Sequence, residues 1–429
     1  MPNHTRYHAD YLIIGGGIAG TTAAEAIRSK DEHGSIAIIS KEPYELYSRV
    51  LLPRYVEGAL SREQVFLRTA EDYNKRSISL YSGEEATVVD INRKEVHTRQ
   101  GAVFFYKQLL IAAGGRVKPW RAEGSEDVPY MRLHTIDDAD AFVSKLLKNR
   151  AQKVVIVGGG FITLELLNAF IPRGISNIHC LIPERGYWED YLGREEGGKF
   201  LESRLEDKGV LLHRGETVTK VGLTQEGTVE VFTTKRTSYT ADMLAVGIGL
   251  DREVEPFGGG EVKVRRGIVT NEFLETGAPD VWAAGDVAEF YHPVFGRHLL
   301  IGNWNNAFLQ GRIVGLNMAM QSTKIGKKQA FTHIPLYAID VLGMHVAFLG
   351  DVSALPKGED KRNYISRFEE GRWFERFGLE DGKLVSAVFV NKFEDKRVIE
   401  RLMQNQSDST PYIPYLSDAS MVLGDVISI

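Results

Sequence analysis

The stretch "ADYLIIGGGIAGTTAAEAIRSK" constrains the fold of this chain more than any other part of its sequence. An apolar run typical of a buried strand leads into Gly15, Gly17 and Gly20, and good helix formers follow. In such a GxGxxG turn the first glycine permits a tight turn, the second lets a diphosphate approach the backbone, and the third lets helix and strand pack closely. Ile18 and Ala19 are the first residues of the expected helix, and the N-terminus of a helix favours the binding of negatively charged phosphates. The stretch therefore predicts a dinucleotide-binding turn.

The next strand, "SIAIIS", ends close to an acidic residue, Glu42. In dinucleotide-binding units an acid about 20 residues beyond the turn binds the ribose hydroxyls of the adenosine. We therefore predict that Glu42 is the ribose ligand, with Ser40 as the alternative if the strand end aligns differently.

A second strand–glycine–helix unit follows at "VVIVGGGFITLELL". Gly158 and Gly160 hold the first two marked positions, Phe161 and Ile162 begin the helix, and Thr163 holds the third position. The third glycine serves packing rather than phosphate contact. A β-branched residue there predicts a helix that lies slightly further from its strand.

The strand after this second turn, "NIHCLIPERG", has Ile182 where we expect the ribose acid, and Glu184 and Arg185 follow it. Two hypotheses stay open. Either this unit is a nucleotide site with two weakened features, or it is a fold that no longer binds a nucleotide. Without an acid at position 182, Arg185 is a candidate partner for a 2′-phosphate.

Composition narrows the class of protein. The chain has 429 residues, a net charge of −5 and scattered positive charges, so nucleic acid is not an expected partner. Its one cysteine, Cys180, excludes a CxxC pair, a four-cysteine zinc site and an iron–sulfur cluster held within the chain. No apolar run approaches the ~20 residues of a membrane span. We expect a cytoplasmic protein without a metal site.

Further segments resemble one family. "YKQLLIAAGGRVKPW" and "ADMLAVGIGLDREVE" resemble the crossings between two nucleotide domains, and "GIVTNEFLETGAPDVWAAGDVAEF" resembles a second flavin motif that ends at Gly285 and Asp286. Together these segments, from about Ala9 to Ala319, resemble the pyridine nucleotide-disulfide oxidoreductase superfamily of two-dinucleotide-binding-domain flavoproteins. Within it, the chain is most similar to ferredoxin and rubredoxin reductases and to the FAD/NAD domains of nitrite reductases.

The resemblance implies an α/β fold with two Rossmann-like dinucleotide-binding domains, for FAD and NAD(P), and a C-terminal α+β domain. The expected parts are 1–118 and 246–323 for FAD, 119–245 for NAD(P), and 324–429 for the interface domain. The last part reads as alternating strands with a hairpin turn at Glu380–Asp381–Gly382 and a closing helix. The final residues, "SDASMVLGDVISI", have no clear counterpart and either pack on this domain or bind a partner.

The resemblance also implies a set of FAD ligands. The backbone of Ala86 would meet the adenine, Arg49 would reach the diphosphate or ribose region, and Asp286 would bond the ribityl chain. A helix beginning in "GNWNNAFLQGRIVG" would point its N-terminus at the flavin and stabilise negative charge on it. The remaining expected contacts are Ala113, Gly114, Trp304 and Asn306.

The predicted catalytic pair is Arg54 and Glu165. In the family a glutamate two residues after the third marked position pairs, near the flavin, with a lysine from the first domain. Here Glu165 takes the glutamate's place and Arg54 takes the lysine's. A guanidinium fork is not equivalent to an ammonium. The alternative is two solvated charges that never meet.

Three functional hypotheses follow. The first is an NAD(P)H-dependent reductase that passes electrons from FAD to an external acceptor, such as rubredoxin or ferredoxin, without a redox-active cysteine. The second is an FAD-carrying electron-transfer subunit of a larger redox complex, and the third a non-catalytic FAD-binding protein that resembles apoptosis-inducing factors. The oligomeric state is left open, with a homodimer among the options.

Overall fold

The computed structural model describes residues 5–148, 153–252, 254–352 and 363–427. Its contacts divide the chain into two compact units. Unit 1 comprises Met1–Ser48, Glu63–Arg116 and Asp251–Pro335, and unit 2 comprises Arg49–Arg62, Val117–Leu250 and Leu336–Ile429. The chain passes between them at β7 (Arg116–Val117) and β15 (Leu250–Asp251), which pair with each other. The finer division into four parts stays a prediction.

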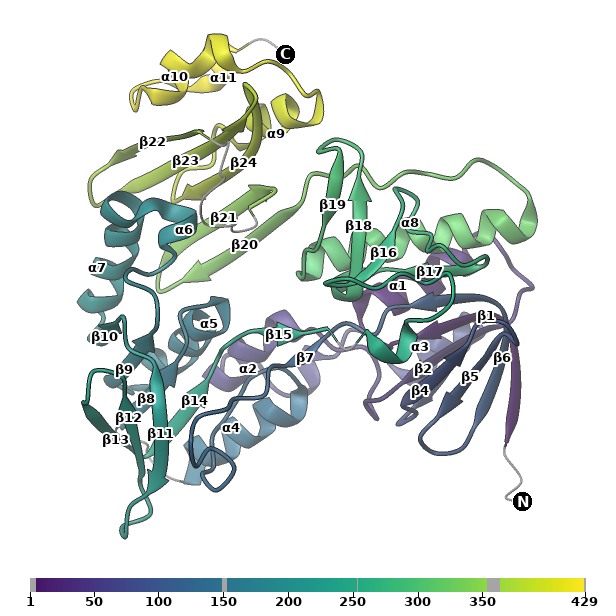
Figure 1. Ribbon diagram of the computed structural model, residues 1–429, viewed down its shortest axis with the longest axis horizontal. Coiled ribbons are helices and arrows are strands. Elements are labelled where there is room, and N and C mark those ends of the chain that lie inside the picture. The colour runs from purple at the N-terminus through teal and green to yellow at the C-terminus, as the bar shows by residue number, and fades with distance from the viewer. Residues whose placement is uncertain (1–4, 149–152, 253, 353–362, 428–429) are drawn as a thin grey trace. The chain divides into compact units, whose positions relative to one another are not determined.

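Unit 1 is built around a mainly parallel sheet (Figure 1). The parallel strands run in the order β3, β2, β1, β6, and β17 pairs with β6. Two antiparallel strands, β5 and β4, extend the sheet beyond β6. The bounds are β1 (Arg6–Ile14), β2 (Ile36–Ser40), β3 (Ile78–Ser82), β4 (Ala86–Asp90), β5 (Glu95–Thr98), β6 (Val103–Ile111) and β17 (Val281–Ala283). Dinucleotides bind such sheets at the carboxyl ends of the strands, where the order reverses, here between β1 and β6.

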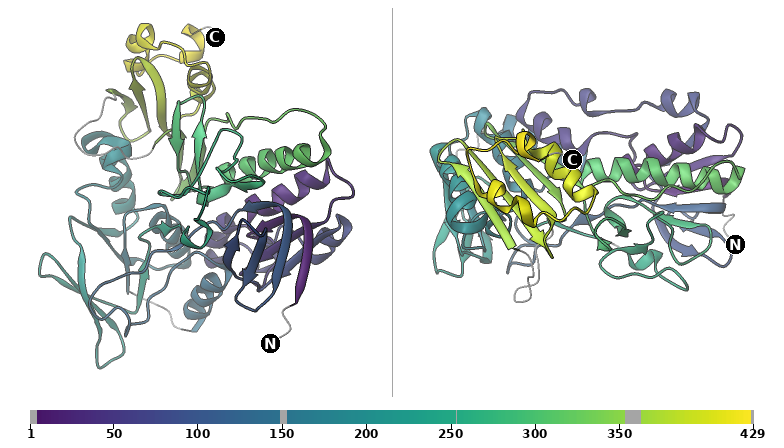
Figure 2. Two further views of the ribbon diagram at one scale, coloured as in Figure 1. Left: turned by 45° about the vertical axis from the view of Figure 1, so that its right-hand side comes forward. Right: turned by 90° about the horizontal axis from the view of Figure 1, so that it is seen from above.

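Both faces of this sheet are covered, which explains the continuous apolar run "YLII". Tyr11 and Ile13 of β1 pack into one cluster with α1 (Ile18–Arg28) and α8 (Trp304–Thr323). Leu12 and Ile14 pack into the cluster on the other face. Figure 2 shows α8 lying along α1. The remaining elements of unit 1 are η2 (Glu63–Val65), α3 (Ala70–Lys75), η5 (Glu255–Phe257), β16 (Ile268–Thr270), η6 (Gly285–Val287), β18 (Ala288–His292) and β19 (Arg297–Leu299).

Glycines in α8 allow the close approach of α1 and α8. A Cβ atom on Gly311 would lie 2.3 Å from the carbonyl oxygen of Ala19, and one on Gly315 would lie 2.4 Å from that of Ala23. Any larger residue would force the helices apart. This packing sets α8 directly beside the helix that begins at the first glycine turn.

Unit 2 repeats the strand order in its own parallel sheet. The order is β10, β9, β8, β14, with β11, β12 and β13 forming a separate antiparallel sheet. The strands are β8 (Lys153–Val157), β9 (Asn177–Ile182), β10 (Val210–Arg214), β11 (Val218–Leu223), β12 (Val229–Thr233), β13 (Ser238–Ala241) and β14 (Met243–Val246). The helices are α4 (Ile136–Lys148), α5 (Phe161–Phe170), η3 (Ile171–Arg173), α6 (Glu189–Leu192), η4 (Gly193–Gly198) and α7 (Lys199–Asp207).

The short segment of residues 49–62 packs on unit 2. It contains η1 (Arg49–Leu51) and α2 (Leu52–Glu57). Arg49 Nη1 donates to the carbonyl of His134 at 2.6 Å, and Tyr55 donates to Asp140 at 2.8 Å. Arg62 also pairs with Asp140, at 2.9 Å. These contacts tie the segment that carries Arg49 and Arg54 to α4.

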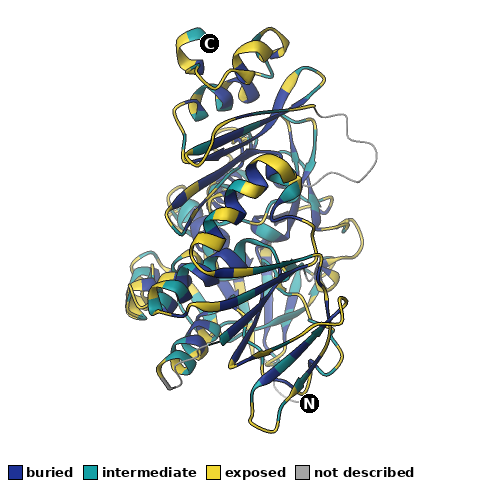
Figure 3. Ribbon diagram, turned by 90° about the vertical axis from the view of Figure 1, so that its left-hand side faces the viewer, coloured by how far each residue is buried: buried dark blue, intermediate teal, exposed yellow. Residues whose placement is uncertain are grey.

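The C-terminal part of unit 2 is an antiparallel sheet with helices, as predicted. The strand order is β20, β21, β24, β23, β22. The three central strands, β21, β24 and β23, are largely buried, whereas the edge strand β22 is mostly exposed (Figure 3). The elements are β20 (Leu336–Val341), β21 (Met344–Gly350), β22 (Asn363–Glu369), β23 (Trp373–Glu380), β24 (Lys383–Val390), α9 (Lys396–Gln404), η7 (Thr410–Tyr412), α10 (Ile413–Ser417) and α11 (Leu423–Val426). The predicted hairpin is confirmed, because Glu380 pairs with Lys383 across Asp381 and Gly382, both at positive φ.

A buried ionic cluster fixes the C-terminal tail on this sheet. The side chains of Arg367, Glu375 and Asp395 are fully buried, and Arg367 pairs with both carboxylates. Asp395 also accepts from the backbone N–H of Leu423 at 2.7 Å. A third guanidinium nitrogen donates to carbonyls of the tail, those of Tyr415, Asp418 and Met421. Of the two hypotheses for the tail, the structure supports packing on its own domain.

No helix among the described residues is long and apolar enough to cross a membrane.

Candidate functional site

The first glycine turn has the geometry that the sequence predicts. Gly15 has φ 111°, and a Cβ atom there would lie 2.2 Å from the carbonyl oxygen of Ala112. A Cβ atom on Gly20 would lie 2.0 Å from the carbonyl oxygen of Gly15. On Gly17 it would meet nothing within 4 Å. Thus two glycines are required by close packing, and the middle one leaves an open face.

The helix that follows this turn presents free donors at its N-terminus. Gly17 is the N-cap of α1, no side chain caps the helix, and its first turn has no acidic residue. The first N–H groups of a helix have no partner within the helix, and the helix dipole adds positive charge there. Ile18 and Ala19 supply such groups, so this end of α1 is suited to a diphosphate.

The second flavin motif lies beside the same helix end. Gly285 has φ 79°, and a Cβ atom there would lie 3.1 Å from that of Ala19. Its N–H donates to Gln310 Oε1 of α8 at 2.7 Å. Asp286, next in the chain, has its carboxylate against Gly302, where a Cβ atom would lie 3.0 Å from Oδ2. The motif, α1 and the start of α8 therefore converge within unit 1.

The start of α8 carries buried polar atoms whose partners are missing from the protein itself. Asn303 caps the helix by accepting from the N–H of Asn306 at 2.8 Å, and Trp304 is the first helical residue. Among the described residues, Asn306 Oδ1 and Gln310 Nε2 are buried without a hydrogen-bond partner. Buried polar groups are normally satisfied. These atoms and the open turn at Gly17 fit a polar cofactor such as FAD.

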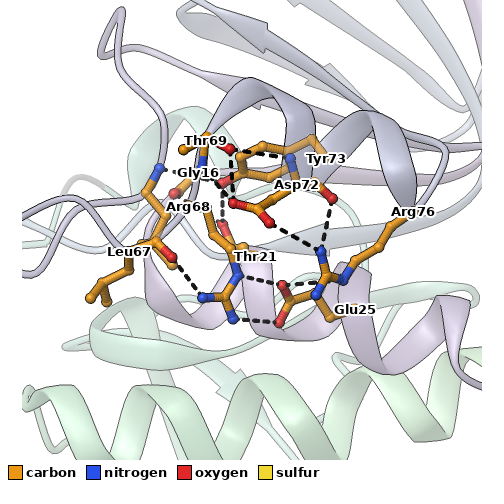
Figure 4. A network of polar contacts seen from close by, with 10 residues as sticks. Gly16, Thr21, Glu25, Leu67, Arg68, Thr69, Asp72, Tyr73 and Arg76 are labelled. Atoms are coloured by element: carbon orange, nitrogen blue, oxygen red, sulfur yellow. Dashed lines mark hydrogen bonds and ion pairs between the residues drawn. The ribbon is translucent and has the colours of Figure 1, made fainter.

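A polar network supports the turn from behind (Figure 4). Arg68 of the loop before α3 makes a bidentate contact with Glu25 of α1, at 2.7 and 3.1 Å. Tyr73 of α3 lies 3.2 Å from the hydroxyl of Thr21, which donates to the carbonyl of Gly16. The network joins α1, α3 and the glycine turn into one rigid piece.

The two units share a backbone hydrogen-bond pattern that shows which residues correspond between their second strands. The N–H of Glu84 donates to the carbonyl of Ser40 and that of Gly83 to Glu42. In unit 2 the N–H of Glu216 donates to Ile182 and that of Gly215 to Glu184. A Cβ atom on Gly16 would meet Ser40 at 3.0 Å, and one on Gly159 would meet Ile182 at 3.2 Å. Ile182 therefore corresponds to Ser40, and Glu184 corresponds to Glu42.

This register corrects the interpretation of the second unit. The sequence pattern predicts the ribose acid at position 182, but Ile182 occupies the position that Ser40 has in unit 1. The carboxylate of Glu184 lies against the turn, with Oε2 3.2 Å from a Cβ position on Gly159. The second unit therefore has an acidic residue at the position of Glu42. Arg185 is 75% exposed at its side chain and pairs with Glu189 at 3.9 Å.

The second turn accommodates threonine without losing its close packing. Gly158 has φ 120°, and a Cβ atom there would lie 2.3 Å from the carbonyl oxygen of Gly247. Thr163 is fully buried, and its hydroxyl donates to the carbonyl of Gly158 at 2.7 Å. Gly160 is the N-cap of α5, which has no side-chain cap and no acid in its first turn. The start of α5 therefore resembles that of α1.

Aromatic rings surround the start of α5. The ring of Phe161 lies 4.6 Å from that of Trp188 and 4.5 Å from that of Tyr337, measured between ring centres. Phe348 lies 5.4 Å away. Ile162 follows Phe161 in the helix and is half-buried, with Cβ 3.3 Å from a Cβ position on Gly247. The C-terminal sheet thus contributes to the walls around this turn.

Among the described residues, the expected pair of Arg54 and Glu165 does not form. The Arg54 side chain is 62% exposed and contacts Glu57 at 3.9 Å, within its own short helix. Glu165 has no hydrogen bond or ion pair there, and burial alone raises its pKa to about 7. Burial also raises the pKa of Tyr337, and the charge of Glu165 adds to this effect. Glu165 is thus a buried carboxyl group without a cation.

The remaining predicted ligands take up loop and strand-end positions. Ala113 and Gly114 follow β6, and Gly114 has φ 71° with open space where a Cβ atom would be. Ala86 begins β4 and is half-buried. Glu42 accepts from the hydroxyl of Tyr47 at 2.5 Å. Arg49 belongs to unit 2, as described above.

Cys180 lies in β9 and is fully buried. Burial raises the pKa of its thiol to about 12, so the thiolate is not formed near neutral pH. The predicted structural thiol is confirmed.

Residues 9–311 match the family described as "Pyridine nucleotide-disulphide oxidoreductase". This match covers more than half of the chain, and the chain belongs to that family. The protein is accordingly an oxidoreductase of the kind that uses FAD and NAD(P)H.

Relatives of known name match over nearly the whole chain. One is the NADH-dependent phenylglyoxylate dehydrogenase subunit epsilon of Aromatoleum evansii, 26% identical over 94% of this chain and 93% of the relative. Another is the NADH-rubredoxin oxidoreductase of Clostridium acetobutylicum, 27% identical over 97% of this chain and 91% of the relative. Among solved structures, the covalent putidaredoxin reductase–putidaredoxin complex contains a chain with a TM-score of 0.86 and 24% identity. That match covers 97% of this chain and 98% of the other. This likeness confirms the predicted fold.

Proposed function

We propose that this protein takes a hydride from NADH and passes electrons singly to a small iron–sulfur protein. The observation that carries the proposal is the repeated site. Two glycine turns have the same register, and each is followed by an acid, Glu42 in unit 1 and Glu184 in unit 2. One turn would hold FAD and the other NADH.

Glu184 is the basis for choosing NADH over NADPH. A carboxylate accepts hydrogen bonds from both ribose hydroxyls but repels a 2′-phosphate. Arg185, the alternative phosphate ligand, points its largely exposed side chain at Glu189. The second unit therefore favours the dinucleotide without the extra phosphate.

The chain's own residues would bind and polarise the flavin. When bound, FAD supplies the step from two-electron to one-electron transfer. The α1 N-terminus would hold the diphosphate, Asp286 would accept from the ribityl chain, and the α8 N-terminus with Asn306 would stabilise negative charge. Ala86, Ala113, Gly114 and Trp304 would complete the pocket within unit 1, and the role of Arg49 stays a prediction. The four-part domain division belongs to the same proposal.

Thiol chemistry is not part of the proposed reaction. The only cysteine of the chain is Cys180, which is fully buried in β9. An external acceptor must therefore take the electrons. Relatives named as reductases of iron–sulfur proteins support the first of the three hypotheses over the other two. A homodimer and a cytoplasmic location stay predictions.

The test is an anaerobic titration of the purified FAD-loaded protein, first with NADH and then with NADPH. We expect NADH to bleach the flavin and NADPH to do so much less efficiently. Glu184→Gln should lower kcat/KM for NADH about 10-fold, because a charge-assisted hydrogen bond is worth about 1.5–3 kcal/mol. The same substitution should lower kcat/KM for NADPH by a smaller factor. Glu196→Gln, an exposed residue in η4, is the matched control.

A second measurement identifies the acceptor. The reduced protein is mixed with rubredoxin and, separately, with a [2Fe–2S] ferredoxin, and the absorbance of each carrier is followed. Rapid reduction of either carrier supports the proposal. A flavin that is bleached by a protein donor but not by NADH would instead identify an electron-transfer subunit.

A further inference from the structure

Both glycine turns are held from behind by a tyrosine and a threonine hydroxyl. In unit 1 the Leu46 N–H donates to the Tyr73 oxygen at 3.3 Å. The Thr21 hydroxyl gives its one proton to the Gly16 carbonyl at 3.2 Å, so Tyr73 must donate to Thr21. Figure 4 shows this chain of bonds reaching the turn. Both hydroxyl protons in this chain are donated in hydrogen bonds. Hydrogen bonds that are linked in a chain polarise and strengthen one another.

Unit 2 makes the same kind of contact with different residues. Thr163 donates to the carbonyl of Gly158 at 2.7 Å. Tyr187 donates to the carbonyl of Gly160 at 3.0 Å. Both side chains are at least 99% buried, so neither bond competes with water. The carbonyls of the first two glycines of the GxGxxG pattern, Gly158 and Gly160, thus each accept a hydrogen bond from a side-chain hydroxyl.

Tyr187 is itself held tightly. Its backbone N–H donates to Glu202 at 2.6 Å, and Arg214 pairs with the other oxygen of that carboxylate at 2.9 Å. Burial raises the pKa of Tyr187 well above its usual value. The hydroxyl therefore stays a neutral donor across the working pH range.

The bonds act on the peptides that face a dinucleotide. The carbonyl of Gly158 shares its peptide with the N–H of Gly159, and that of Gly160 shares its peptide with the N–H of Phe161. A hydrogen bond accepted by a carbonyl polarises the peptide and makes its N–H a stronger donor. It also holds the peptide plane in place before the ligand arrives, which lowers the cost of binding.

We propose that Thr163 and Tyr187 are positioning residues that fix the second glycine turn for the diphosphate of NADH. The inference rests on the proposed function of this turn. Thr163, which departs from the usual glycine, then strengthens the site, because glycine would leave the carbonyl of Gly158 without its buried donor. Thr163, at the position where the pattern has glycine, is then part of the binding site.

The test compares variants of the FAD-loaded protein by calorimetric titration with NAD⁺ and with ADP-ribose, which keeps the diphosphate but lacks nicotinamide. Tyr187→Phe and Thr163→Val each remove one hydroxyl. We expect each to weaken both ligands by about 2- to 12-fold, the value of one hydrogen bond. Thr163→Ser should restore binding, and Thr163→Gly should weaken it. Tyr191→Phe, in the nearby helix α6, is the matched control, because the Tyr191 hydroxyl makes no hydrogen bond among the described residues.

Steady-state kinetics and thermal unfolding separate positioning from general stability. A positioning role should raise KM for NADH with little change in kcat, because it affects ground state and transition state alike. Unchanged dissociation constants with a lowered Tm would overturn the proposal, and so would tighter binding by Thr163→Gly. If the unmutated protein binds neither NAD⁺ nor ADP-ribose, the proposed function fails as well. Normal binding by the unmutated protein with unaffected variants refutes only this inference.

Discussion

Glu165 is a largely buried carboxyl group with no cationic partner among the described residues, and replacing it with an uncharged residue should stabilise the protein. Burial raises its pKa from 4.5 to about 7. Between these values the folded protein holds a proton that the unfolded chain has released, so the free energy of unfolding falls as pH rises. Above the folded pKa the penalty is complete. Below the unfolded pKa it is absent.

The size of the effect follows from the same values. One pKa unit corresponds to about 1.4 kcal/mol, so the difference between 4.5 and about 7 corresponds to about 3 kcal/mol. Part of the side chain remains accessible to solvent, which makes this figure an upper limit. Glu165→Gln keeps the shape and removes the charge. The variant should therefore gain up to about 3 kcal/mol at pH 8.5 and close to nothing at pH 4.5.

The assay is urea unfolding of the FAD-loaded protein and the Glu165→Gln variant at a series of pH values from 4.5 to 8.5. Glu196→Gln, an exposed carboxylate, is the control and should give no pH-dependent difference. A stability difference that is the same at every pH would refute the reasoning. A variant that is less stable than the unmutated protein at pH 8.5 would show that Glu165 has a cationic partner after all.

Three further predictions concern other parts of the chain. Asp286→Ala should weaken FAD binding about 10- to 100-fold, measured by equilibrium dialysis, because a charge-assisted hydrogen bond is lost; unchanged affinity would remove Asp286 from the site. Cys180→Ala should leave the rate of electron transfer within a factor of about 2, since the thiol is fully buried and protonated, and a large loss with normal folding would contradict this. Arg367→Met should cost about 3–5 kcal/mol of stability and expose the tail to limited proteolysis, because it leaves the buried carboxylates of Glu375 and Asp395 with only the longer contacts to Lys392 and removes the hydrogen bonds to the tail carbonyls. A tail that still resists protease would disprove the anchoring role.

Local patterns were enough to predict the glycine turns and the C-terminal hairpin. A turn between a strand and a helix is specified by a few adjacent residues, so Gly15 and Gly158 adopt the positive φ that their spacing implies. The Asp381–Gly382 turn is set in the same way, by two residues that tolerate positive φ. These features need no knowledge of distant segments.

Contacts between side chains that are far apart in the sequence could not be predicted from the spacing of residues in the motifs. Arg54 and Glu165 occupy the expected positions, yet Arg54 contacts Glu57 in its own helix turn. Which charges meet depends on helix rotation and on side-chain direction, and both are set by packing. The predicted contact between Arg54 and Glu165 is therefore absent among the described residues, although the elements that carry the two residues are as expected.

The sequence by itself determined the two nucleotide turns, the single buried thiol and the family, because each of these is a property of adjacent residues or of composition. Only the tertiary structure decided which acid lies beside the second turn and which partner the threonine hydroxyl finds there. The position of Glu184 follows from the backbone hydrogen bonds between the end of its strand and the residues after the next strand. Tyr187, which bonds to the carbonyl of Gly160, is 27 positions further along the chain. Both depend on register between segments far apart in the chain, which folding alone brings together.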